Sequence, residues 1–131
     1  MEIRQFRVVV RARDFARSCR FYGEVLALPR LQSWDRETGR GALYQAGTGV
    51  IEVVGRPHGA GRDRDEAFDY QGPSQKLNLS LVVASAERVY EEAIFRERNI
   101  PGGLRQEPDG SVVFITHDPD GVQLLFRETE A

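Results

Sequence analysis

"FRVVVRARDFARSCRFYGEVLAL", residues 6–28, decides the fold because its plan returns later in the chain. An apolar strand comes first, and Asp14 follows it as a residue that can cap a helix. Apolar residues then recur at helical spacing: Phe15, Cys19, Tyr22 and Leu26. The stretch therefore predicts a strand followed by a helix that buries one face.

The same plan recurs in "LNLSLVVASAERVYEEAIFRERNI", residues 77–100. Ser85 is placed as the helix cap, and the expected buried stripe is Ala86, Val89 and Ala93. The run Pro101-Gly102-Gly103 should end this helix. The chain is thus expected to contain an internal repeat.

Three short strand-like segments separated by turns follow each helix. They are residues 31–35, 42–46 and 50–54 in the first half, and 104–107, 111–116 and 122–127 in the second. The sequence therefore predicts an α+β fold of two βαβββ modules. We expect one domain spanning residues 1–131, with module 1 at 1–55, a Gly-, Pro- and charge-rich linker at 56–75, and module 2 at 76–131.

Alternation along the predicted strands separates two faces of each sheet. One face is almost wholly apolar and should carry the helices: Phe6, Val8, Val10, Ile51, Val53, Leu77, Leu79, Leu81, Val83, Val122, Leu124 and Phe126. The opposite face is mixed: Arg7, Val9, Arg11, Val50, Glu52, Val54, Asn78, Ser80, Val82, Gln123, Leu125 and Arg127. Binding pockets have such a composition, so we expect a sheet curled around a cavity.

Composition narrows the classes of partner. A chain of 131 residues with 40% hydrophobic content can bury a sizeable core, and its net charge of −2 gives no overall attraction to nucleic acid or anionic lipid. No apolar run is long enough to span a membrane, and the first residues lack the apolar stretch of a signal peptide. The single cysteine excludes an intramolecular disulfide. We expect a cytoplasmic protein whose partners are small molecules or a second copy of itself.

At three stretches the chain resembles the vicinal oxygen chelate superfamily, which includes glyoxalase I, bleomycin-resistance proteins and extradiol dioxygenases. These stretches are "VVVRARDFARSCRFYGEVLAL" (8–28), "GVIEVV" (49–54) and "HDPDGVQLLF" (117–126). The resemblance implies a cup-shaped mixed sheet built from two modules, and a homodimer. It also implies a divalent metal held by one side chain from the first and last strand of each module.

Carried over one at a time, the metal positions of that superfamily fall on Arg7, Glu52, Asn78 and Leu125. His is usual at the first and third of these positions, Glu or His at the second, and Glu at the fourth. Glu52 alone remains a good ligand, and a guanidinium repels a metal cation. We therefore expect no metal and no cofactor. Arg7 and Glu52 are expected to pair, either as a structural ion pair or as part of a ligand site.

Several other residues suit either a functional or a structural role. Trp34 and Tyr44 on predicted strands suit stacking on a planar ligand, or else core or dimer contacts. Phe68 and Tyr70 in the linker suit either a lid or a loop anchor. The remaining candidates are better explained by structure than by chemistry: His58, His117, Cys19, Glu107, Asp109, Asp118 and Asp120.

Two classes of function follow. The first is a metal-independent binding protein that holds an organic ligand in the cup, with Arg7, Glu52, Asn78, Leu125, Trp34, Tyr44 and Ser80 as the expected contacts. The second is a lyase, isomerase or dioxygenase of the glyoxalase type with a degenerate metal site. There Glu52 would act as general base, although Arg7 beside it opposes that role by lowering its basicity. The sequence leaves open whether any reaction is catalysed. It also leaves open a third interpretation, in which the fold serves only in protein association.

Overall fold

The chain folds into two compact units, Met1–Gln71 and Gly72–Ala131. The computed structural model describes residues 1–57, 77–97, 100 and 102–128, and each unit is treated by itself. Within these residues no helix is both long and apolar enough to cross a membrane.

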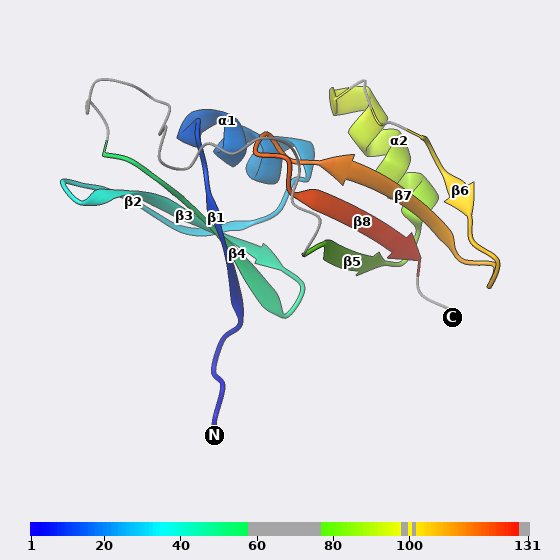
Figure 1. The fold of residues 1–131 in the computed structure, drawn as a ribbon, viewed down its shortest axis with the longest axis horizontal. Coiled ribbons are helices and arrows are strands. Elements are labelled where there is room, and N and C mark those ends of the chain that lie inside the picture. Colours follow the sequence, from blue (N-terminus) through cyan, green and yellow to red (C-terminus); the bar gives the residue numbers. More distant parts are fainter. Residues whose placement is uncertain (58–76, 98–99, 101, 129–131) are drawn as a thin grey trace. The chain divides into compact units, whose positions relative to one another are not determined.

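Unit 1 is a βαβββ module (Figure 1). Its elements are β1 (Arg7–Arg11), α1 (Phe15–Arg20), the π-helix η1 (Phe21–Val25), β2 (Arg30–Arg36), β3 (Gly39–Ala46) and β4 (Gly49–Gly55). The four strands form one mixed sheet in the order β1-β4-β3-β2, with β1 parallel to β4 and the other neighbours antiparallel.

The first helix begins where the sequence predicts. Asp14 has an extended backbone, and its Oδ1 accepts a hydrogen bond from the backbone N–H of Arg17 at 3.1 Å. This bond satisfies one of the N–H groups that every helix leaves free in its first turn. The helix then widens into η1, where the N–H of Leu26 reaches back to the carbonyl of Phe21 at 2.9 Å.

The core of unit 1 lies between α1, η1 and one face of the sheet. Val10 and Val53 contribute from the strands, and Tyr22 of η1 packs toward Tyr44 of β3 with ring centroids 6.3 Å apart. Phe15 of α1 comes so close to β4 that a Cβ on Gly55 would lie 2.9 Å from the Phe15 Cβ. This helix-facing side of the sheet is therefore densely packed.

Unit 2 repeats the module (Figure 1). Its elements are β5 (Leu79–Val83), α2 (Ala86–Glu97), β6 (Arg105–Gln106), β7 (Val112–His117) and β8 (Gln123–Glu128), and the strand order is β5-β8-β7-β6. Ser85 caps α2 by accepting a hydrogen bond at Oγ from the N–H of Arg88 at 3.2 Å. Tyr90 of α2 meets Phe114, which stacks on Phe126 with centroids 4.7 Å apart.

The predicted α+β fold of two βαβββ modules is confirmed, including both helix caps. Two core assignments are wrong, because Phe6 is 67% exposed and Leu77 is 76% exposed. Each precedes the strand to which it was assigned, since β1 begins at Arg7 and β5 at Leu79. The alternation rule applies only within the paired strand. The stripe residue Ala93 belongs to α2, and the predicted linker lies largely outside the described residues.

Candidate functional site

The face of the unit 1 sheet that is turned away from α1 carries most of the predicted ligand contacts of that unit. Cross-strand pairing places Val9 beside Glu52, Glu52 beside Leu43, and Trp34 beside Gly41. Directly paired residues point to the same side of a sheet. We call this surface, defined by Arg7, Val9, Trp34 and Glu52, the ion-pair face.

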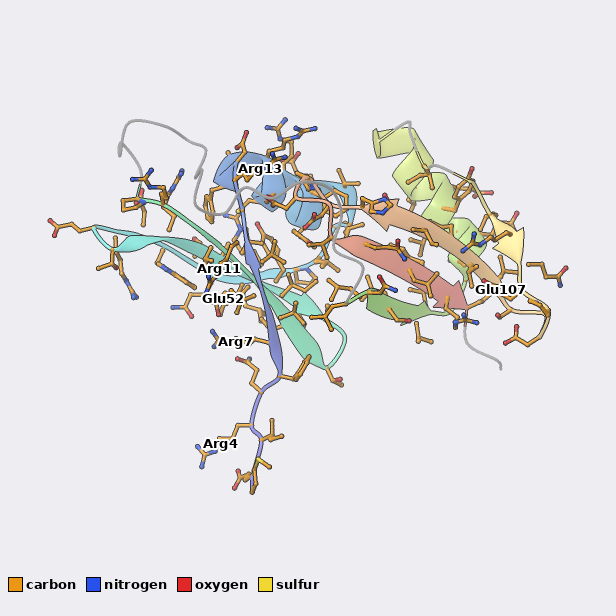
Figure 2. All side chains as sticks on the ribbon, in the orientation of Figure 1. Arg4, Arg7, Arg11, Arg13, Glu52 and Glu107 are labelled. Atoms are coloured by element: carbon orange, nitrogen blue, oxygen red, sulfur yellow. The ribbon has the colours of Figure 1, made fainter. Side chains whose placement is uncertain are left out.

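Arg7 and Glu52 form the pair that the sequence predicts. Nη1 of Arg7 donates to Oε1 of Glu52 at 2.9 Å, from β1 to the neighbouring β4 (Figure 2). The Arg7 side chain is 42% exposed, whereas that of Glu52 is 18% exposed. Arg7 also donates through Nε to the side-chain oxygen of Gln5. The cation is thus accessible from one side and held from the other.

Trp34 lies flat over a glycine on the same face. A Cβ built on Gly41 would lie 2.0 Å from Cζ2 of Trp34, so the indole occupies the space that any larger residue at Gly41 would need. The guanidinium of Arg36 is 5.8 Å from the indole centroid. Trp34 is partly exposed, and it is the single tryptophan of the chain. The ring is therefore an accessible aromatic surface with a fixed orientation.

Tyr44 lies on the helix-facing side of the sheet, away from the ion-pair face. Its hydroxyl donates to the carbonyl oxygen of Cys19 at 3.2 Å and accepts from Nη2 of Arg30 at 3.2 Å. Burial, reinforced by a hydrogen bond with the Cys19 thiol, raises the pKa of Tyr44 to about 12. The structure thus separates Tyr44 from Trp34, with which the sequence grouped it.

The remaining predicted contacts belong to unit 2. Asn78 is exposed and precedes β5, while Ser80 of β5 is directly paired with Leu125 of β8. The pair Ser80 and Leu125 is the counterpart of Val9 and Glu52 in unit 1, because both join the parallel first and last strands of a module. Leu125 is half-buried and presents an aliphatic side chain at the position equivalent to Glu52.

Two of the turn acids of unit 2, Asp118 and Asp109, hold backbone geometry, as expected. Oδ1 of Asp118 accepts from the N–H groups of Asp120 and Val122, both at 2.8 Å. Asp109 Oδ1 accepts from the N–H of Ser111 at 2.9 Å and from its hydroxyl at 2.7 Å, and these bonds lower the pKa of Asp109. Two loop candidates and one histidine fall outside the described residues: Phe68, Tyr70 and His58. His117 is exposed at the end of β7.

With this geometry in place, a family model of the Glyoxalase/Bleomycin resistance protein/Dioxygenase superfamily matches residues 4–126. The chain belongs to this superfamily. The solved structures agree on the fold of this superfamily member. The structure of SMU.1112c aligns with a TM-score of 0.76 at 19% identity, covering 94% of this chain and 96% of the other.

Two further solved structures align over nearly their whole length. TioX from Micromonospora sp. ML1 gives a TM-score of 0.67 at 16% identity, covering 95% of this chain and 97% of TioX. Lactoylglutathione lyase from Agrobacterium tumefaciens gives a TM-score of 0.63 at 17% identity, covering 94% of this chain and 91% of the lyase. No curated protein sequence matches the chain. At these identities the likeness concerns the fold alone.

The metal set implied by the superfamily resemblance does not fit the residues of this chain. In unit 1 the carboxylate of Glu52 already has a guanidinium nitrogen 2.9 Å away, which holds the place that a metal cation would need. In unit 2 the corresponding positions carry an amide and an aliphatic side chain, Asn78 and Leu125. Among the described residues no three His, Cys, Asp or Glu side chains come together as a metal cluster.

The sequence reasoning missed Gly41, which makes room for the Trp34 ring. A signal was present, because a glycine inside a strand often marks the close approach of another group. It also missed Arg30, for which no signal existed, since its direction depends on an irregularity in strand pairing.

Proposed function

We propose that this protein binds a small organic molecule on the ion-pair face without a metal ion. The observation that carries the proposal is the contact between Arg7 and Glu52 at 2.9 Å. It places a permanent organic cation beside the single carboxylate among the four expected metal positions. The site can therefore recognise polar groups of a ligand by hydrogen bonding, where a metal would coordinate them.

The ion-pair face offers three kinds of contact. Among the described residues Arg7 donates through Nη1 and Nε, which leaves the N–H groups of Nη2 for a carbonyl or carboxylate oxygen. Val9, which is 51% exposed, supplies apolar surface. Trp34 supplies a planar ring two strands away from Glu52 and two residues farther along the sheet, a separation of about 12 Å. A planar organic ligand with a polar acceptor matches these features.

The proposal also covers the oligomeric state of the protein and its cellular compartment. We expect a homodimer in the cytoplasm, with ligand contacts supplied also by Asn78, Ser80 and Leu125. The support is the superfamily resemblance and the single cysteine. Light scattering on the purified protein should give a mass of about twice the 14.8 kDa chain. A mass of a single chain would contradict the dimer.

The experiment combines metal analysis with fluorescence. Protein purified without chelator should contain no stoichiometric Zn, Ni, Mn or Fe. A panel of aromatic metabolites and antibiotics is then titrated against the emission of Trp34, which reports from the ion-pair face alone because the chain has one tryptophan. A ligand of this face should change the emission saturably and remain unconverted.

The matched variants are Arg7→Ala and Arg4→Ala. Both remove an arginine that contacts a glutamate, but the contact of Arg4 with Glu2 at 3.2 Å lies in a highly exposed segment before β1. Arg7→Ala should weaken ligand binding about tenfold or more, as expected for loss of a charge-assisted hydrogen bond. Arg4→Ala should leave affinity unchanged. Stoichiometric metal, or equal affinities for both variants, would reject the proposal.

A further inference from the structure

A cavity lies on the opposite side of the unit 1 sheet from the ion-pair face, between the helical segment and strands β2 and β3. Its volume is about 510 Å³, within the range of small-molecule sites. All of its lining residues belong to unit 1. Tyr44 forms its wall on the sheet, and Leu28 and Ala16 add apolar surface. It is distinct from the ion-pair face, because Tyr44 and Glu52 point to opposite sides of the sheet.

The π-helix η1 and Gly23 make this space. A π-helix is wider than an α-helix and often occurs at functional sites. Gly23 within η1 lines the cavity, and a Cβ there would lie 3.1 Å from Cε1 of Tyr44. Because glycine has no side chain, the wide turn passes close to the tyrosine without filling the cavity.

A β-bulge turns Arg30 toward this cavity. Arg30 pairs with Tyr44, but the next pair is Gln32 with Leu43, so two residues of β2 span one step of β3. The extra residue is Leu31. Because of it, the residues that follow in β2 face the opposite side of the sheet from the one that simple alternation starting at Arg30 would give. Arg30 therefore faces the Tyr44 side, whereas Trp34 on the same strand faces the ion-pair face. Bulges re-aim side chains in this way next to functional sites.

The charges in the cavity wall favour an anion. Arg30 and Arg20 bring two permanent positive charges, against the single carboxylate of Glu24. The hydroxyl of Tyr44 is engaged by Arg30 and by the carbonyl of Cys19, so it holds the guanidinium in place. The guanidinium also lies over the Tyr44 ring, 5.6 Å from its centroid. A cation fixed at the mouth of a partly apolar space is suited to bind an organic acid.

We propose that this cavity binds a small organic carboxylate, with its acid group on Arg30 and its apolar body against Leu28 and Ala16. Arg20 adds to the positive potential at the same opening. A guanidinium presents paired N–H donors that match the geometry of a carboxylate. The site is independent of the ion-pair face, and it extends the protein's binding capacity to a second ligand.

The test uses the full ¹⁵N-labelled chain and 1-naphthoate as the probe. Saturable shifts are expected for the amides of Cys19, Gly23 and Leu28, which line the cavity. The neutral analogue 1-naphthalenemethanol should bind about tenfold more weakly or worse, because it lacks the charge. The indole N–H resonance of Trp34 in the same spectra should stay in place, which separates this site from the ion-pair face.

Arg30→Gln should reduce naphthoate affinity about tenfold or more, whereas Arg36→Gln on the same strand is the matched control and should not. If Arg30→Gln does not fold, the comparison of naphthoate with the neutral analogue in the unmodified chain decides. Equal binding of the two probes overturns the inference. The inference is also overturned if the cavity amides show no saturable shifts. It is overturned as well if the shifts are found mainly at Val9 and Glu52.

Discussion

Arg30 donates a hydrogen bond from Nη2 to the hydroxyl of Tyr44, 3.2 Å away, although Gln32 and Trp34 on the same strand face the other side of the sheet. One strand thus places a cation on the helix-facing surface and an aromatic ring on the opposite surface. The extra residue Leu31 causes this change of side. The two candidate sites of unit 1 therefore share β2 without sharing side chains.

Gly41→Ala should displace the Trp34 ring. The new Cβ would lie 2.0 Å from Cζ2 of Trp34, which is closer than any real contact, so the ring must move. We expect a loss of about 1 to 3 kcal/mol in the free energy of unfolding, together with a shift in tryptophan emission. Gly49→Ala is the control, because its Cβ would meet two backbone carbonyl oxygens, of Ala46 at 3.6 Å and of Phe6 at 3.8 Å, both ordinary contacts. Unchanged emission in Gly41→Ala would contradict the described packing.

Stability should fall in alkaline solution as Tyr44 ionises. The pKa of Tyr44 is raised from 10.0 to about 12 in the folded chain, so the unfolded chain loses this proton first. The stabilisation is complete below pH 10 and is lost as the pH rises toward about 12. By pH 11.5 the loss should amount to about 1 to 2 kcal/mol, because the folded chain is then only partly ionised. Urea unfolding at pH 9 and pH 11.5 measures it.

Tyr44→Phe is the control for this pH dependence. It removes the ionising group, so its stability should change less between the two pH values than that of the unmodified chain. The variant also loses the hydrogen bond to the Cys19 carbonyl, and it should be less stable at neutral pH by about 1 kcal/mol. Equal alkaline losses in both proteins would show that Tyr44 titrates normally.

Cys19 should react slowly with thiol reagents. Burial raises the pKa of its thiol, although the hydrogen bond with Tyr44 and the charges of Arg30 and Arg40 oppose this rise. Since the thiolate is the reactive form, iodoacetamide should modify the folded chain at least about tenfold more slowly than the urea-unfolded chain. The chain has one cysteine, so mass spectrometry follows this residue directly. Equal rates would mean that the thiol is open to solvent.

Arg7→Ala should lower stability by about 0.5 to 1 kcal/mol, the range of half-exposed ion pairs, because Glu52 then loses its cation. Added salt should shrink this difference from the unmodified chain, since screening weakens the pair. Arg4→Ala should have no measurable effect, because both partners of that contact are highly exposed. Urea midpoints at low and high salt give the comparison. If the urea midpoint of Arg7→Ala is no lower than that of Arg4→Ala, the ion pair of Arg7 and Glu52 does not contribute to the stability of the fold.

The sequence was informative wherever local chemistry decides the structure. The caps Asp14 and Ser85 fixed both helix starts, because a side-chain oxygen at that position satisfies a free backbone N–H. Alternation placed Arg7 and Glu52 on one face, since β1 and β4 pair without an irregularity between these residues. The ion pair of Arg7 and Glu52, observed at 2.9 Å, could therefore be predicted from the sequence.

The features that sequence reasoning missed depend on pairing between strands. Tyr44 and Trp34 were grouped as aromatic residues of neighbouring strands, yet they face opposite sides. The bulge at Leu31 and the widened turn of η1 leave no mark in hydrophobic periodicity, because neither changes which residues are apolar. The cavity beside Arg30 arises from these two irregularities, so it could be found only in three dimensions.

The shared strand order of the two units has a practical consequence for every experiment on this protein. Glu52 and Leu125 occupy equivalent positions in the last strands of the two units, where Glu52 is paired with Val9 and Leu125 with Ser80. The molecule thus contains its own reference: a second module of the same strand order in which the position equivalent to Glu52 carries an uncharged side chain. A charged residue placed at position 125 would show how much of the behaviour of unit 1 comes from the side chain and how much from the backbone that presents it.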